Sequence, residues 1–239
     1  MERTNNKPLI VAHRGGASTK ALENTIEAFK KAFEDAADAI EGDFHLTKDG
    51  VIVCTHDYDI EGLVIKESSF SELKALKPQL PTLQDVLELI TDDKIIYIEI
   101  KCGVEIFPSL VSVLQLSNVE HSQIVIISFN ADVIKESEIL FPEIKTYWLC
   151  YLKAKEVPDV ERCINVLKSS QADGLSTTMN THVNERLIKA LHTNGFSYHA
   201  WTVNSVEDAK ALLKWGTASI TTDKVVEIRE GVFSKNMSI

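Results

Sequence analysis

The chain has 239 residues, of which 44% are hydrophobic and 25% charged, and its formal net charge is −10. This composition is ordinary for a globular protein with a real core, and the length suits one large α/β barrel better than two small domains. The negative charge argues against a nucleic-acid partner, because duplex binding needs clustered Lys and Arg. We therefore expect one domain over residues 1–239 and a small-molecule partner.

The cysteines and the N-terminus bear on location. The four cysteines show no spacing typical of a zinc site or of a disulfide framework, so reduced thiols are expected. Residues 1–7 carry no signal-peptide core, and no apolar run approaches 20 residues. These features predict a cytoplasmic protein without stable membrane insertion, and they leave the oligomeric state open.

Short apolar runs alternate with amphipathic segments along the chain. Nine runs are strand-like: 9–13, 39–46, 51–56, 95–101, 124–129, 145–150, 174–177, 198–203 and 218–222. The segments between them carry helix signals. Ser69 with Glu72, and Thr82 with Asp85, resemble capping boxes, and Gly195 stands where a helix should end. This alternation predicts parallel strands joined by helices.

One pair of runs breaks the alternation. Leu46 and Val51 are separated by only four residues, too few for the crossover that parallel strands need. Asp49-Gly50 is a hairpin signal, so the run 51–56 should return antiparallel to the run before it. The fold class predicted is α/β, a TIM (β/α)8 barrel with a β-hairpin extension after strand 2 and a short insertion over 57–80. A doubly wound sheet is the alternative, but no GxGxxG-type loop supports it.

The turn of this hairpin decides which residues face His56. With Asp49-Gly50 at the centre of the turn, His56 would lie opposite Asp43. With Lys48-Asp49 at the centre, it would lie opposite Glu41. Either register sets His56 beside two carboxylates, and a three-residue turn with a bulge would blur the pairing.

Polar side chains collect at the carboxyl ends of the predicted strands, where barrel enzymes place their active sites. They are His13, Arg14, Glu41, Asp43, His56, Glu99 and Lys101. Residues two apart in a strand share a face, so Glu41 accompanies Asp43, and Glu99 accompanies Lys101. His45 is expected to be exposed and idle. The remaining histidines, His121, His182, His192 and His199, are expected to be surface or helix-packing residues.

Three carboxylates crowded in a barrel mouth repel one another unless a cation lies among them. Oxygen ligands suit one divalent cation, Mg²⁺ or Ca²⁺, rather than zinc. The alternative is that Glu41, Asp43 and Glu99 merely pair with Arg14 and Lys101.

The other strand-end residues suggest further roles. His13 and His56 titrate near neutral pH and suit an acid and a base, with a structural role as the alternative. Arg14 and Lys101 suit a bound phosphate. Trp201, at the end of a late strand, serves either as an apolar wall of a substrate pocket or in core packing.

These residues stand in motifs that resemble a known family. His13-Arg-Gly-Gly-Ala-Ser18 followed by Glu23-Asn-Thr25 is similar to the opening of the glycerophosphodiester phosphodiesterases. The same family order continues through Glu41-x-Asp43, Thr47-x-Asp-Gly50, His56-Asp57, Pro81-Thr-Leu, Glu99-x-Lys101, Ser128-Phe129 and Trp201-Thr-Val-Asn204. The resemblance spans essentially the whole chain.

The resemblance implies a TIM barrel that hydrolyses glycerophosphodiesters to sn-glycerol 3-phosphate and an alcohol. It implies His13 and His56 as the acid–base pair and Arg14 and Lys101 as phosphate-binding residues. It implies three ligands of Ca²⁺ or Mg²⁺, namely Glu41, Asp43 and Glu99. No Ser–His pair is evident at a strand end, so the attacking group is water or the substrate's own glycerol hydroxyl, which proximity favours.

The sequence also departs from the family pattern. Leu22 replaces a usual proline, Gly42 replaces an apolar residue, and the stretch after Asp57 lacks a Leu-x-Arg-Thr segment. The short insertion leaves the alcohol side of the pocket undefined. Alternative functions are a lysophospholipase D-type or phospholipid-cleaving phosphodiesterase on the same barrel, or a catalytically silent phosphodiester-binding protein.

Overall fold

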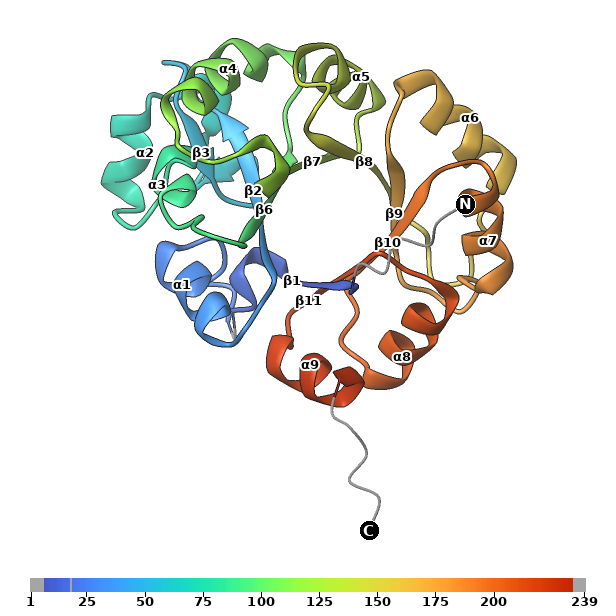
Figure 1. Cartoon of the computed structure of the whole chain (residues 1–239). Helices are drawn as coiled ribbons and strands as arrows, with labels where there is room; N and C mark the ends of the chain where they lie inside the picture. Colours follow the sequence, from blue (N-terminus) through green and yellow to red (C-terminus); the bar gives the residue numbers. More distant parts are fainter. Residues whose placement is uncertain (1–6, 18, 234–239) are drawn as a thin grey trace.

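The computed structural model describes residues 7–17 and 19–233, and these form a closed barrel of parallel strands surrounded by helices (Figure 1). Residues 1–6 and Ser18 lie outside the described residues. The expectation for the N-terminal segment and one residue of the first motif therefore fall outside the structure described. The barrel strands are β1 (Leu9–Ala12), β2 (Ala39–Leu46), β6 (Ile95–Ile100), β7 (Ile124–Ser128), β8 (Lys145–Cys150), β9 (Gly174–Thr178), β10 (Ser197–Trp201) and β11 (Ser219–Thr222).

These strands pair in the order β1-β11-β10-β9-β8-β7-β6-β2, and the pairing of β1 with β2 closes the ring. The predicted TIM barrel is therefore confirmed, and every predicted strand forms with its ends shifted by no more than two residues.

The helices that follow the strands form an outer ring (Figure 1). They are α1 (Ile26–Glu34), α2 (Phe70–Leu76), α3 (Leu83–Leu87), α4 (Phe107–Leu116), α5 (Ala131–Leu140), α6 (Val160–Ser170), α7 (Glu185–Thr193), α8 (Val206–Trp215) and α9 (Val225–Phe233). Both predicted capping boxes are present at the starts of α2 and α3. Gly195 follows α7 with a φ of 87°, as expected for a helix stop. No helix in the described ranges is long and apolar enough to cross a membrane.

The alternation of side chains along each strand divides the core in two. Residues such as Ile10, Ile40 and Ile98 face the helices in the large outer cluster. The alternate residues fill the barrel interior, where Val11, Ala39, Tyr97, Val125, Ile127, Tyr147 and Leu149 pack together. Glu41 and Asp43 follow Ala39 on the inward face of β2, and Glu99 follows Tyr97 on that of β6. The alternation along each strand therefore places these polar residues at the carboxyl-terminal mouth of the barrel.

The predicted hairpin is present, but neither two-residue turn is correct. β3 (Ile52–Cys54) pairs antiparallel to β2 with Leu46 opposite Ile52, and the N–H of Thr47 donates to the carbonyl of Val51 at 2.9 Å. Three residues, 48–50, therefore form the turn, and Gly50 adopts a φ of 83°. Asp49 accounts for the longer turn, because its carboxylate accepts hydrogen bonds from the Thr47 hydroxyl and the Phe70 N–H.

This register moves His56 by one residue. The N–H of Thr55 donates to the carbonyl of Asp43 at 2.9 Å, so His56 lies one residue beyond that level and directly opposite neither Asp43 nor Glu41. The insertion then forms a small hairpin of β4 (Asp59–Ile60) and β5 (Leu63–Val64) before α2. Its apolar side chains, with Val53, build a separate cluster of Ile60, Ile65, Leu73 and Leu80.

Candidate active site

Three carboxylates converge at the mouth of the barrel. Glu41 and Asp43 come from β2 and Glu99 from the adjacent β6, where Asp43 and Glu99 are register partners. One oxygen of each residue lies within 4.8 Å of the others. Glu41 and Asp43 are buried, with exposed fractions of 2% and 0%. Ionised carboxylates at this spacing and burial need compensating positive charge.

Asp43 receives most of the compensation that the protein supplies. Its Oδ2 accepts a hydrogen bond from Asn24 Nδ2 at 2.8 Å and lies 3.1 Å from Arg14 Nε, while its Oδ1 lies 3.2 Å from Lys101 Nζ. Burial alone would raise the pKa of Asp43. The positive charges of Lys101 and Arg14 outweigh burial, and the pKa falls below its ordinary value. Asp43 is thus held ionised.

Lys101 also lies 2.7 Å from Glu99 Oε1, so one ammonium group serves two carboxylates. The pKa of Glu99 nevertheless lies above its ordinary value, first because the group is buried and second because Asp43 is negatively charged. The two cations, Arg14 and Lys101, therefore do not neutralise the cluster fully.

Glu41 is the carboxylate whose negative charge is least compensated. Its Oε2 accepts the backbone N–H of Arg14 at 2.9 Å, whereas its buried Oε1 has no hydrogen-bond partner among the residues that the structure describes. Burial, followed by the negative charge of Asp43, raises the pKa of Glu41 to about 8. An orphaned buried oxygen beside two further carboxylates is the arrangement that a divalent cation with oxygen ligands would satisfy.

The alternative of simple ion pairs accounts for only part of this geometry. Arg14 points its guanidinium at Asp43 and at Glu23, whose Oε2 lies 2.9 Å from Nη1, and Lys101 contacts Asp43 and Glu99. Neither side chain forms an ion pair with Glu41 within the described part of the chain.

The two histidines of the motifs flank the cluster from different elements. His13 lies directly after β1 in a short 3₁₀ turn, and its Nδ1 is 2.7 Å from Asp223 Oδ1. His56 follows β3, and its Nδ1 is 2.8 Å from Asp57 Oδ1. Burial lowers the pKa of His13, but the hydrogen bond to Asp223 and the charge of Glu41 raise it more, so the net pKa lies above its ordinary value.

The backbone next to His13 depends on a glycine. Gly15 has a φ of 87°, and a Cβ added there would lie 2.7 Å from the Cβ of Ala28. Only glycine permits both this conformation and the close approach of α1. The motif glycine thus positions the His13-Arg14 segment by packing.

Sequence reasoning missed several residues that contact the site. Asn24 donates to Asp43, Asp223 contacts His13, and Asn204 Nδ2 donates to Asp223 Oδ2 at 2.7 Å. Asn24 and Asn204 stood inside recognised motifs without an assigned role. Asp223 follows β11 as His13 follows β1, so the rule of strand ends would have found it.

The expectation for His45 was wrong. His45 is buried, with 9% of its surface exposed, and its Nε2 donates to the backbone carbonyl of His56 at 3.2 Å. It therefore braces the His56 segment. The expectation for His199 was wrong as well, because this residue lies inside the barrel, between the hydroxyls of Ser197 and Ser219 and stacked on Tyr147.

Trp201 joins an aromatic group at the end of β10. Its ring lies 5.7 Å from that of Phe129 at 84°, and 6.5 Å from that of Tyr151. Phe129 and Tyr151 are exposed, while Trp201 also packs against the barrel interior. Phe129 follows β7, Tyr151 follows β8 and Trp201 ends β10, whereas the charged residues lie in or directly after β1, β2 and β6 (Figure 1). The mouth is thus polar on one side and aromatic on the other.

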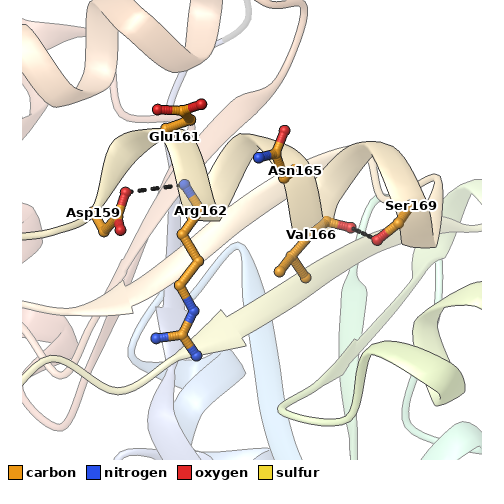
Figure 2. Close-up of a pocket in the computed structure, with 6 residues that line it drawn as sticks. All are labelled: Asp159, Glu161, Arg162, Asn165, Val166 and Ser169. Atoms are coloured by element: carbon orange, nitrogen blue, oxygen red, sulfur yellow. Dashed lines mark hydrogen bonds between the residues drawn. The ribbon is translucent and has the colours of Figure 1, made fainter.

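A hollow of about 540 Å³ lies away from these residues, along α6 (Figure 2). It is lined by Asp159, Glu161, Arg162, Asn165, Val166 and Ser169. All six belong to one helix and its N-cap, and Asp159 is already engaged in capping the N–H of Arg162. We assign no function to this groove, because no strand-end residue contributes to it.

The barrel and its acidic mouth define a (β/α)8 protein with a carboxylate-rich site at the carboxyl ends of its strands. The sequence matches the model of the "Glycerophosphoryl diester phosphodiesterase family" over residues 13–227. The chain belongs to this family and is a phosphodiesterase.

Individual relatives agree with this assignment. A glycerophosphodiester phosphodiesterase of Caldanaerobacter subterraneus subsp. tengcongensis is 34% identical, over 91% of this chain and 94% of that protein. One of Bacillus altitudinis is 31% identical, over 92% and 98%. Among solved structures, a glycerophosphodiester phosphodiesterase of Thermotoga maritima has a TM-score of 0.76 at 28% identity, covering 93% of this chain and 97% of its own. An Oleispira antarctica phosphodiesterase, solved with its product sn-glycerol-3-phosphate, has a TM-score of 0.83 at 23% identity and covers 95% and 97%.

Proposed function

We propose that this protein hydrolyses glycerophosphodiesters to sn-glycerol 3-phosphate and an alcohol, and that Glu41, Asp43 and Glu99 hold one divalent cation for the reaction. The observation that carries the proposal is the convergence of three carboxylates within 4.8 Å, one with an orphaned buried oxygen. Family membership and the activity named for the Caldanaerobacter relative support the substrate class.

The donor set favours a divalent cation that prefers oxygen ligands. Three carboxylate groups provide only oxygen, which Mg²⁺ and Ca²⁺ prefer, and no cysteine or histidine belongs to the cluster among the described residues. A bound cation would offset the charge of the phosphate and polarise its oxygens. Arg14 and Lys101 already lie against Asp43, and each has further N–H donors with which to hold a phosphate oxygen.

His13 and His56 are proposed as the acid–base pair. One accepts the proton of the attacking hydroxyl, and the other donates a proton to the departing alcohol. The attacking group is proposed to be the glycerol hydroxyl next to the phosphate ester, because an intramolecular group gains from proximity. Cys54 does not compete for this role, because complete burial raises the pKa of its thiol well above the ordinary value. Water would then open the cyclic phosphate.

The aromatic side of the mouth is proposed to receive the departing alcohol. Trp201 and its neighbours Phe129 and Tyr151 form an apolar surface away from the carboxylates. Trp201 packs on the barrel interior and contacts exposed rings, so the two roles considered for it, packing and pocket wall, are compatible.

Turnover of glycerophosphocholine with and without a chelator tests the proposal. Release of choline that stops on chelation and returns with Mg²⁺ or Ca²⁺ is expected. A silent binder would retain affinity without product. Parallel reactions with lysophosphatidylcholine and with other head groups separate the lysophospholipase D alternative, which predicts faster cleavage of the single-chain lipid.

A cytoplasmic location is also proposed. The four cysteines Cys54, Cys102, Cys150 and Cys163 are free thiols, which fits a reducing compartment. Fractionation of cells that produce the full-length protein tests this location.

A further inference from the structure

A chain of hydrogen bonds runs along the rim of the barrel and ends on His13. His13 follows β1, Asp223 follows β11 and Asn204 follows β10, and these three strands are neighbours in the barrel (Figure 1). Asp223 Oδ1 lies 2.7 Å from His13 Nδ1, and Asp223 Oδ2 accepts a hydrogen bond from Asn204 Nδ2 at 2.7 Å. Three adjacent strand ends are therefore joined through their side chains.

The orientation of Asn204 is determined by its other contacts. Its Oδ1 accepts hydrogen bonds from the hydroxyl of Thr222 and from the backbone N–H of Asp223, both at 2.9 Å. Because the oxygen is occupied by two donors, the amide nitrogen must be the atom that faces Asp223. Asn204 thus requires a hydrogen-bond acceptor at the nearer oxygen of Asp223.

We propose that Asp223, oriented by Asn204, is a positioning residue that holds His13 with its proton on Nδ1 and leaves Nε2 for proton transfer. The inference rests on the proposed acid–base role of His13. A carboxylate on one ring nitrogen selects the tautomer and the ring orientation of a histidine, and thereby its function. It also gives a task to Asn204, the last residue of the Trp201-Thr-Val-Asn204 motif.

The second histidine lacks an equivalent support. Among the described residues no side-chain amide donates to Asp57, and its Oδ2 lies 3.1 Å from Lys20 Nζ at an exposed position. His56 is also more exposed than His13, with side-chain exposed fractions of 39% and 19%. Of these two histidines, only His13 is therefore supported by a chain of hydrogen bonds that joins the ends of three strands.

Asp223→Asn is the informative variant, because the structure predicts how the new amide will lie. Asn204 presents an N–H group, so the oxygen of the new amide would turn towards Asn204 and its nitrogen towards His13. A donor at that position favours the tautomer with an unprotonated Nδ1. In serine proteases the corresponding exchange lowers kcat by about 10⁴. Asp223 is partly exposed, so we expect a loss of roughly 10–100-fold with glycerophosphocholine.

An exchange of the two side chains provides the rescue. In Asn204→Asp/Asp223→Asn, the carboxylate at 204 accepts the amide nitrogen at 223, and the amide oxygen then faces His13 Nδ1. The net charge equals that of the parent protein. We expect the exchange variant to recover at least roughly tenfold of the lost kcat, because the acceptor is restored. The single change Asn204→Asp places two carboxylates together and should also lower kcat.

The kinetic constants of Asp223→Asn distinguish a positioning role from a purely structural one. Under the positioning proposal, KM and the affinity for added Mg²⁺ stay within about twofold of the parent values in Asp223→Asn, and kcat alone falls. In a His13→Ala background, Asp223→Asn should cause no further loss. Melting temperatures verify that each variant is folded.

The outcomes separate this inference from the proposed function. Full turnover by His13→Ala would show that the acid–base proposal itself is wrong. If His13→Ala loses activity while Asp223→Asn keeps the parent kcat, the positioning role is overturned. It is likewise overturned if Asp223→Asn lowers kcat equally with and without His13, or if the exchange variant recovers nothing.

Discussion

Binding of the cation should release a proton from Glu41. Burial and the charge of Asp43 raise the pKa of Glu41 to about 8, so in the metal-free protein about nine-tenths of this group is protonated at pH 7. A carboxylate must lose its proton to bind a metal ion. We therefore expect the release of about 0.9 proton from Glu41 at pH 7 and about 0.1 at pH 9, with an added contribution from Glu99, whose pKa is also raised.

The same argument gives the pH dependence of affinity. Below pH 8, each decrease of one pH unit should lower the affinity for Mg²⁺ or Ca²⁺ by about tenfold. Above pH 8 the affinity should level off. Titration calorimetry at pH 7, repeated in buffers with different ionisation enthalpies, measures the protons released. Glu161→Gln, which removes a carboxylate on α6 outside the cluster, is a control and should bind the cation as the parent does. Equal affinity at pH 6 and pH 8, or no proton release, would refute the reasoning.

The raised pKa also has a consequence for the stability of the metal-free protein. The folded pKa of Glu41 exceeds its ordinary value of 4.5, so the folded state binds the extra proton between these two pH values. The associated stability is complete below about pH 4.5 and is lost as the pH rises through about 8. The shift corresponds to a few kcal/mol, on the order of 4–5 at most. Metal-free Glu41→Gln should therefore melt at a higher temperature than the parent at pH 9. An unchanged or lower melting temperature would contradict the raised pKa of Glu41.

Three further predictions concern the reaction. His13→Ala and His56→Ala should each lower kcat by about 10²–10⁴ in a folded protein, and near-normal turnover of a substrate with a poor leaving group by either variant would remove that histidine from the acid–base pair. Arg14→Lys should raise KM and leave the melting temperature nearly unchanged, because a planar guanidinium fork becomes a point charge. Unchanged KM and kcat would leave Arg14 a structural role only. A diester whose glycerol lacks the hydroxyl next to the phosphate ester should be cleaved much more slowly, and product analysis that finds an undiminished kcat would favour attack by water.

Much of the fold was predictable because its signals are local. The nine strand runs followed from short apolar segments, and the capping boxes at Ser69 and Thr82 followed from side chains three residues from their partners. The hairpin followed from the short spacing between Leu46 and Val51. Its register did not, because Asp49 gains hydrogen bonds to Thr47 and to the distant Phe70, and a turn pattern cannot anticipate the second contact.

The residue content of the site followed from strand order and side-chain parity. In a parallel barrel the carboxyl ends of all strands meet at one mouth, so Glu41, Asp43 and Glu99 were expected together before any contact was known. The histidines that sequence reasoning set aside show the limit of this rule. His45 is buried through its hydrogen bond to the backbone of His56, and His199 lies within the barrel between Ser197 and Ser219.

The sequence by itself determined the barrel, the polar strand ends and the family, because periodicity, spacing and motifs are properties of neighbouring residues. Only the tertiary structure decided how charge is shared in the mouth. Arg14 and Lys101 both approach Asp43, so Asp43 stays ionised while the pKa of Glu41 rises to about 8. It also decided that Asp223, 210 positions from His13, lies against that ring. Pairing of β1 with β11 brings together the residues that directly follow these two strands, and burial at the mouth then sets the strength of each contact.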